Sequence, residues 1–309
     1  HGPFSHVLEN TLIHGISHEE ISLMMMEKMN REMKGMLTLA INIFKDRYPK
    51  RFLHQLISSQ LDMDRLDYLR RDSFYTGVTE GNIGSARIIK MLNVVDDNLV
   101  VDSKGIYSIE NYLTSRRLMY WQVYLHKTTV AYEKLLINLL KRAKHLANEG
   151  HNLFAPPALH YFLYNHIDRE TFLSREEALT NYALLYDNDI WSSVKVWMSH
   201  EDKILSLLSR SLIERKIFKV EVRNEPIPKE EMTALLGNIA NATGLTPEDA
   251  SYLMSVDTIQ KDMYDINDDH ISILYKDGTI KDITEASEIL NISLLSKKIC
   301  KYYLCYQRI

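Results

Sequence analysis

The stretch Ser58-Ser59-Gln60-Leu61-Asp62-Met63-Asp64-Arg65-Leu66-Asp67-Tyr68-Leu69-Arg70-Arg71-Asp72 decides how this chain is interpreted. It predicts a helix that begins after a polar segment. Asp64, Tyr68 and Asp72 follow one another at intervals of four residues, so they share one helical face. The three leucines lie on other faces and can pack into a core. A stripe of two carboxylates and a phenol beside Arg65 fits either a salt-bridged surface helix or a ligand site.

A histidine-rich segment begins the chain and bears on the choice between a surface helix and a ligand site. His1-Gly2-Pro3-Phe4-Ser5-His6 is followed by Glu9, His14 and His18. Taken with residues 62–72, which read D-x-D-R-x-D-Y-x-x-R-D, the segment resembles the HD-domain phosphohydrolases. The likeness is closest to the sterile-alpha-motif/HD type of deoxynucleoside triphosphate (dNTP) triphosphohydrolase, and it covers about the first half of the chain. The two motifs are specific as an ordered pair.

The resemblance implies a divalent metal ion, and the sequence does not distinguish among Mn, Mg, Fe, Ni and Zn. In the family a histidine and a His-Asp pair upstream of H-G-P-F-S-H complete the metal site with the residue that matches Asp64. These three ligands are not in this sequence. We therefore expect the chain to be a C-terminal part of a longer protein. We also expect it to bind metal poorly and to be inactive by itself, since one carboxylate does not hold a catalytic ion.

The resemblance also implies which side chains move protons. The positions that match the family's acid and relay histidines are His1, His6 and His18. Histidine suits this work because it titrates near neutral pH. The family commonly has Asp three residues after the histidine that matches His6, whereas this chain has Glu9. The longer side chain keeps the charge but moves it outward, which weakens the case for the same relay role.

The substrate-binding residues implied by the resemblance lie on two predicted helices. Arg65 and Arg116 would fork onto phosphate oxygens. Tyr68 and Tyr124 would flank the sugar, and Asp72 would accept a hydrogen bond from the sugar 3′-hydroxyl. A surface ion pair is the ordinary alternative for Arg116. His126 and Lys127 match a pair that borders a nucleotide effector site in regulated members, although a solvated helix face explains this pair as well.

Composition excludes several other classes of protein. Of the 309 residues, 45% are hydrophobic and 25% are charged, as is usual for a soluble domain. The net charge of −4 gives no reason to expect general nucleic-acid binding. Two cysteines, Cys300 and Cys305, form no disulfide framework and fit a reducing cytoplasm. We find no apolar run long enough to span a bilayer and no signal peptide, so no membrane partner is expected.

The predicted fold is mainly α, with an HD-type helical core and a small C-terminal α+β module. Residues 1–215 would form the helical domain, truncated at its N-terminus, and residues 216–309 the module. The module is indicated by alternation at 218–222, a hairpin signal at 271–280 and a final strand at 301–306. Residues 108–148 lack Pro and Gly and predict one helix of about 40 residues, about 60 Å long. We expect the Asp64 helix to face the segment His1–His18 across a cleft.

Three functions remain open from the sequence. The leading one is a metal-dependent dNTP triphosphohydrolase, which releases a deoxynucleoside and triphosphate. The second is another HD phosphohydrolase, acting on a nucleoside monophosphate or on a cyclic or guanosine-type nucleotide. The third is a nucleotide-binding assembly protein without turnover. Family members are commonly dimers or tetramers, so we expect a homo-oligomer with a nucleotide substrate and, in regulated members, a nucleotide activator. The long helix would be a sensible interface.

Overall fold

The computed structural model describes residues 3–261, 264, 270–287 and 299–308. Most of them are helical, which confirms the predicted mainly α class. Contacts divide the chain into two compact units. Unit 1 comprises residues 1–28, 127–259 and 301–309, and unit 2 comprises residues 29–126 and 260–300. Each unit is built from segments that are distant in the sequence, and each is described by itself below.

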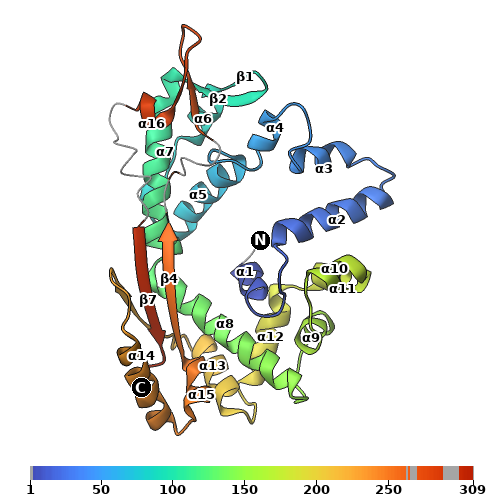
Figure 1. The fold of residues 1–309 in the computed structure, drawn as a ribbon, viewed down its shortest axis with the longest axis vertical. Coiled ribbons are helices and arrows are strands. Elements are labelled where there is room, and N and C mark those ends of the chain that lie inside the picture. The colour runs from blue at the N-terminus through green and yellow to red at the C-terminus, as the bar shows by residue number, and fades with distance from the viewer. Residues whose placement is uncertain (1–2, 262–263, 265–269, 288–298, 309) are drawn as a thin grey trace. The chain divides into compact units, whose positions relative to one another are not determined.

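Unit 1 is a group of helices around one long central helix, α8 (Lys127–Asn148) (Figure 1). Leu135, Leu139 and Leu140 of α8 are fully buried, because α1, α9 and α13 pack around it. Trp197 adds the largest buried side chain. The other helices are α1 (Pro3–Glu9), α2 (His18–Glu32, which continues into unit 2), α9 (Pro157–Tyr164), α10 (Arg169–Ser174), α11 (Glu176–Leu184), α12 (Asp187–Trp197), α13 (Lys203–Ile213), α14 (Lys229–Thr243), α15 (Pro247–Ala250) and the 3-10 turn Ser251–Leu253.

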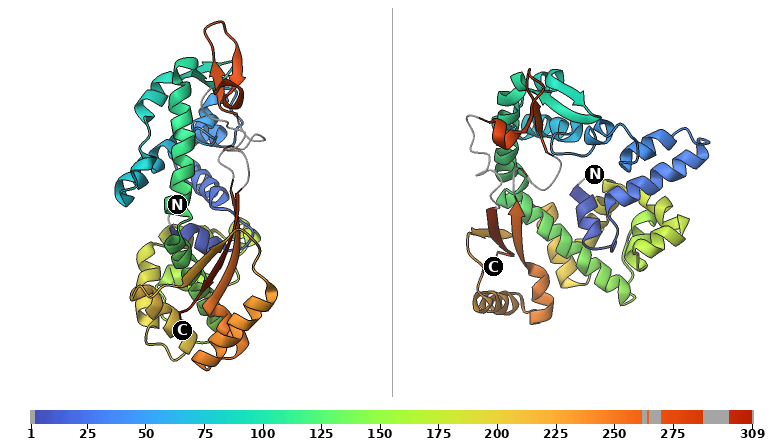
Figure 2. Two further views of the ribbon diagram at one scale, coloured as in Figure 1. Left: turned by 90° about the vertical axis from the view of Figure 1, so that its left-hand side faces the viewer. Right: turned by 45° about the horizontal axis from the view of Figure 1, so that its top comes forward.

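A three-stranded sheet covers part of α8 in the same unit (Figure 2). Its order is β3 (Lys219–Arg223), β7 (Ile299–Tyr306) and β4 (Met254–Lys261). β3 and β7 are antiparallel, with Val220 opposite Cys305. Cys305 is fully buried, and burial raises the pKa of its thiol to about 12. It is therefore a packing residue and not a reactive thiol.

Unit 2 combines helices with a four-stranded sheet of order β1-β2-β5-β6. The parallel pair β2–β5 joins strands from distant parts of the chain. Leu66, Leu69 and Tyr112 form its core with Ile88. The elements are α3 (Thr38–Phe44), α4 (Phe52–Gln55), α5 (Met63–Thr76), the 3-10 turn Thr79–Gly81, α6 (Ser85–Met91), β1 (Leu92–Val95), β2 (Asn98–Asp102), the 3-10 turn Ser103–Gly105, α7 (Ile106–Met119), the π turn Tyr120–Tyr124, β5 (Ser272–Leu274), β6 (Ile280–Asp282) and α16 (Ile283–Ala286).

The prediction of one helix over residues 108–148 is wrong. The α-helix α7 ends at Met119, a π turn follows, and α8 begins at Lys127 after a non-helical Leu125. Aromatic residues have only modest helix propensity, so contacts made by the side chains of residues 120–124 can decide the local geometry. The apolar face of α8 is buried inside unit 1 itself, and the expected interface role of this helix stays a prediction.

The strands expected after residue 216 are confirmed, with shifts of one or two residues at their ends. They do not share one sheet. β3, β7 and β4 form the sheet of unit 1, whereas β5 and β6 extend the sheet begun by β1 and β2 in unit 2. The domain boundary between residues 215 and 216 stays a prediction. Among the described residues, no helix combines the length and apolar character needed to cross a bilayer.

Candidate active site

The first group of candidate residues lies in unit 1, where α1 is followed by a short loop and α2. His6 and Glu9 are three residues apart on α1, and His18 is the first residue of α2. Glu9 Oε1 accepts a hydrogen bond from the backbone N–H of His18 at 2.6 Å and lies 2.8 Å from its ring Nδ1. The other oxygen of Glu9 lies 3.6 Å from Nδ1 of His6. The carboxylate thus lies between the two imidazoles.

Exposure differs sharply within this group, which we call the histidine cluster (His6, Glu9 and His18). The side chain of His6 is 66% exposed, whereas those of Glu9 and His18 are 20% and 15% exposed. The rings of His6 and His18 meet edge to face at 5.2 Å. One imidazole can therefore reach a ligand directly, while the carboxylate and the second imidazole stand behind it.

Backbone contacts hold the loop that joins Glu9 to His18. Leu12 and Ile13 are fully buried, and the N–H of His14 donates to the carbonyl of Ile167 at 3.0 Å. Gly15 has a φ of +69°, a conformation that other residues adopt only with strain, so it supplies the sharp turn before α2. The predicted capping box at the start of α2 is confirmed in both directions, between Ser17 and Glu20.

The electrostatics of the histidine cluster favour a proton relay. His18 Nε2 lies 3.2 Å from Glu19, so both ring nitrogens of His18 face a carboxylate. Burial opposes the charge on Glu19, but a hydrogen bond from Ser17 and the nearby His18 and His6 bring the pKa of Glu19 below its usual value. The three cluster residues could also offer ligand atoms to a metal, since these atoms all lie within 4.8 Å of one another. Metal binding would require His18 to give up one carboxylate contact.

The second group lies in unit 2 and begins with α5. The side chain of Asp62 caps this helix by accepting from the N–H of Arg65 at 2.7 Å. The Arg65 guanidinium donates to the Asp62 carboxylate and to the carbonyl of Ser59, so it is turned toward the start of its own helix. Asp64 lies exposed in the first turn. Arg65 would have to leave these partners to fork onto a phosphate.

Asp72 and Tyr124 meet directly. The hydroxyl of Tyr124 donates to Oδ2 of Asp72 at 2.6 Å, across 52 residues of sequence. Burial, together with this carboxylate, raises the pKa of Tyr124 well above its usual range. The ring of Tyr68 meets that of Tyr124 edge to face at 5.9 Å. Tyr124 closes the π turn, and π turns often occur at functional sites.

Arg116 lies among phenols, and we call Arg116 with Tyr68, Tyr112 and Tyr120 the tyrosine cage. Its guanidinium carbon lies 5.8 Å from the ring centre of Tyr120, a cation–π distance. Burial disfavours the charge, but the three phenols together raise the pKa of Arg116 above its ordinary value. Burial raises the pKa of Tyr112 to about 12 and that of Tyr68 further. The cage therefore presents a permanent cation beside neutral hydroxyl groups.

The structure thus collects the predicted residues into two groups, one in each unit. His6, Glu9 and His18 come together in unit 1; Tyr68, Asp72, Arg116 and Tyr124 come together in unit 2. His1 lies outside the described residues. The expected cleft between the Asp64 helix and the histidine segment stays a prediction. Sequence reasoning missed Tyr112 as a cage residue, although its spacing of four from Arg116 was a usable signal.

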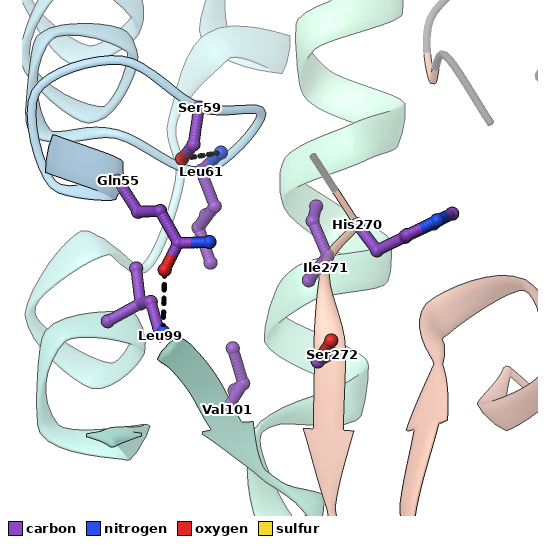
Figure 3. Close-up of a pocket in the computed structure, with 8 residues that line it drawn as sticks. All are labelled: Gln55, Ser59, Leu61, Leu99, Val101, His270, Ile271 and Ser272. Atoms are coloured by element: carbon purple, nitrogen blue, oxygen red, sulfur yellow. Dashed lines mark hydrogen bonds between the residues drawn. The ribbon is translucent and has the colours of Figure 1, made fainter. Parts of the chain in front are cut away.

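One hollow in each unit can be compared with these groups. One in unit 2 is lined by Gln55, Ser59 and Leu61 with residues of β2 and β5 (Figure 3), but its volume of about 10 Å³ is no larger than a water site. Gln55 accepts from the N–H of Leu99 at 2.7 Å, which fixes the segment that leads into α5. The other, of about 280 Å³ in unit 1, has Lys127, Lys219 and Arg308 among its lining residues.

Comparisons with known proteins show the superfamily of the chain. The model of a family described as "HD associated region" matches residues 83–153. A protein of Bacillus subtilis strain 168, YwfO, described as uncharacterized, is 31% identical over 324 residues, which span all of this chain and 71% of that protein. The chain belongs to the HD-domain phosphohydrolase superfamily.

Two further HD relatives differ in how much of their length is matched. The crystal structure of a phosphohydrolase from Bacteroides thetaiotaomicron superposes with a TM-score of 0.96 at 66% identity, over all of this chain and 76% of that one. A Dictyostelium discoideum protein described as a deoxynucleoside triphosphate triphosphohydrolase SAMHD1 homolog is 26% identical over 161 residues, which are 46% of this chain and 31% of that protein. The first supports the fold over the whole chain, and the second supports a more distant relation over half of it.

Proposed function

We propose that the full-length protein is a metal-dependent hydrolase of deoxynucleoside triphosphates, releasing a deoxynucleoside and inorganic triphosphate. The observation that carries this proposal is the tyrosine cage with the neighbouring Tyr124–Asp72 pair. A half-buried arginine among phenols favours an anionic partner, and a phosphate group accepts its forked N–H donors. The distant relation to a protein described as a dNTP triphosphohydrolase supports the same substrate class.

The residues of unit 2 would bind the nucleotide. Arg116 would hold phosphate oxygens, and Arg65 would join it after leaving Asp62 and Ser59. Tyr68 and Tyr124 would flank the sugar. Asp72 uses Oδ2 for Tyr124, which leaves its other oxygen to accept from the sugar 3′-hydroxyl. These contacts would orient the α-phosphorus, and orientation supplies a large part of the rate in such reactions.

The histidine cluster would supply the proton. Water adds to the α-phosphorus, the bond to the 5′-oxygen breaks, and the deoxynucleoside leaves with a proton on that oxygen. His6 is the exposed member and would give this proton, while Glu9 and His18 would replace it through their contacts of 3.6 and 2.8 Å. This assignment gives Glu9 the relay role that the family commonly assigns to Asp.

A divalent ion would polarise the phosphate and lower the pKa of the attacking water. Of the predicted residues, Asp64 would contribute a carboxylate from the first turn of α5, where it is exposed. One carboxylate does not form a metal site by itself. The cations that line the hollow near Lys127 suit an anionic effector, in keeping with the expected nucleotide activator.

Product analysis on the full-length protein tests the proposal. Each dNTP would be incubated with Mn²⁺ or Mg²⁺, beside an Asp64→Ala variant and a matched Asp67→Ala variant on the same helix. We expect triphosphate and deoxynucleoside from the unmodified protein and from Asp67→Ala, and neither product from Asp64→Ala. Release of single phosphates would instead support the alternative function, that of another HD phosphohydrolase. If the protein binds nucleotide but gives no product with any metal ion or added nucleotide, the result would support the third function, a nucleotide-binding assembly protein without turnover.

A further inference from the structure

The turn that leads into α5 contains a buried carboxylate to which the proposed function gives no role. Asp62 is 3% exposed and is the N-cap residue of the helix. One oxygen of its side chain accepts from the N–H of Arg65 at 2.7 Å, and the other accepts from the N–H of Ser59 at 3.2 Å. The second oxygen also accepts from the guanidinium of Arg65. Asp62 therefore binds one of the two arginines that the proposed function assigns to phosphate.

The backbone of this turn is fixed on both sides of the N-cap residue. The buried hydroxyl of Tyr112 donates to the carbonyl of Gln60 at 2.7 Å, and the N–H of Met63 donates to the carbonyl of Leu56 at 3.0 Å. Gln60 itself is 3% exposed. The side chain of Arg65 is 27% exposed, so it has more room to move than the turn against which it lies.

Asp62 can release the guanidinium of Arg65 and still keep hydrogen-bond donors. Its two backbone donors, the N–H groups of Ser59 and Arg65, do not depend on where the guanidinium lies. The carboxylate also lies at the N-terminus of α5, where the helix dipole favours negative charge. A buried carboxylate without such donors would hold its cation much more strongly. The contact between the two side chains is therefore one that a competing anion can displace.

A phosphate group competes for the same donors as this carboxylate. Guanidinium N–H groups bind carboxylate and phosphate oxygens in the same forked geometry. Arg65 can bind a nucleotide fully only in the fraction of molecules in which it has left Asp62. The apparent affinity for the anion falls in proportion to that fraction.

We propose that Asp62 is a positioning residue that holds Arg65 at the start of its own helix until an anion displaces it, and so sets the affinity for the triphosphate chain. The inference rests on the proposed function, because it takes Arg65 as a phosphate ligand. It gives the first aspartate of the D-x-D sequence a role that differs from that of Asp64. Asp64 would contribute to a metal site, whereas Asp62 acts through the arginine that follows.

Calorimetric titration of the full-length protein with inorganic triphosphate tests this role without turnover. Asp62→Asn keeps an N-cap residue, since asparagine caps helices as well as aspartate does, but it removes the charge that attracts Arg65. We expect the dissociation constant for triphosphate to fall about three- to tenfold. In steady-state kinetics KM for a dNTP should fall similarly, with kcat nearly unchanged. An unchanged or larger dissociation constant would overturn the proposal, because Asp62 would then only cap the helix or would assist Arg65.

Two further variants separate this role from simpler effects of charge and folding. Asp67→Asn is the matched control, because Asp67 is an exposed carboxylate of α5 that pairs with Arg71 at 3.0 Å, and it should leave triphosphate binding unchanged. Asp62→Ser also provides a capping side chain without charge, so it should repeat the effect of Asp62→Asn if the amide disturbs the turn. Thermal unfolding of each variant checks that the fold is intact.

A double-variant cycle shows whether the effect acts through Arg65. In an Arg65→Met background, Asp62→Asn should leave the dissociation constant for triphosphate unchanged, since no guanidinium remains to be released. Equal tightening in both backgrounds would overturn the proposal, because it would come from the loss of repulsion alone.

The outcome for this inference is separate from the outcome for the proposed function. If the protein turns over dNTPs and Asp62→Asn has no effect, the proposed function stands and this inference fails. If Asp62→Asn tightens triphosphate binding but no dNTP is turned over, this inference is supported and the proposed function fails.

Discussion

The histidine cluster and the tyrosine cage handle charge in opposite ways. In the cluster, carboxylates contact imidazoles of graded exposure, so a proton can be bound at one end and replaced from behind. In the cage, burial raises the pKa of Tyr68 and Tyr112, so these two phenols stay neutral, while Arg116 stays charged. The first arrangement suits groups that change their protonation state during a reaction. The second suits groups that keep one state and hold an anion in place.

The largest effect should come from removing the fixed charge of the cage. If Arg116 holds the phosphates as proposed, Arg116→Met should lower kcat/KM for a dNTP by about 100- to 1000-fold, because a charge-assisted contact in a half-buried site is strong. Steady-state kinetics with the full-length protein provide the measurement. Arg117→Met, one residue along the same helix, is the control. Equal losses in the two variants would show that the cage does not bind the phosphates.

A large effect on kcat should follow from changing the relay carboxylate of the cluster. Glu9→Gln keeps the shape but removes the charge between His6 and His18, and we expect kcat to fall about 100-fold with KM nearly unchanged. Glu19→Gln, at the more exposed carboxylate, should lose much less. A rise in KM without a fall in kcat would show that Glu9 contributes to substrate binding and not to proton transfer. The histidine cluster would then not differ from the tyrosine cage in its role.

The packing of α8 against α9 in the unit that contains the cluster can be tested through Lys144, which is buried in α8. Its ammonium donates to the carbonyls of Phe162, Leu163 and Asn165 at 3.0, 2.9 and 2.6 Å, at the end of α9. Lys144→Met removes these donors, so the free energy of unfolding should fall by about 2 kcal/mol at pH 7. Chemical denaturation gives this value, and Lys141→Met on an exposed face of α8 is the control.

The same lysine predicts a pH dependence. Burial lowers the pKa of Lys144 from 10.5 to about 8, so the unfolded chain binds more protons than the folded chain between these pH values. Stability should therefore rise with pH from about 8 to 10.5 in the unmodified protein relative to Lys144→Met. Parallel denaturation curves at pH 7.5, 9 and 10 check the sign. A difference that narrows as pH rises would contradict it.

The smallest effect should come from the hydroxyl that joins Tyr124 to Asp72. Tyr124→Phe keeps the ring contact with Tyr68 but frees the carboxylate oxygen, and we expect about a tenfold loss in kcat/KM, mostly through KM. Tyr107→Phe at an exposed position of α7 is the control. A loss as large as that of Arg116→Met would mean that the hydroxyl takes part in the chemistry and does not only position Asp72.

The sequence by itself determined most of the local structure and the identity of the candidate residues. Spacing placed Asp64, Tyr68 and Asp72 on one helix, the capping box marked the start of α2, and alternation located β3. These signals are local, because they depend on helical and strand periods and on contacts within a few residues. The two ordered motifs also indicated the superfamily to which the chain belongs.

Only the tertiary structure decided the break at the π turn, the phenols around Arg116 and the division of the late strands between two sheets. No local rule predicts that Tyr124 meets Asp72, because their contact spans 52 residues of sequence. β5 likewise pairs with β2 across most of the chain. Such contacts form only when distant segments pack together, so their consequences for charge and burial cannot be derived from periodicity.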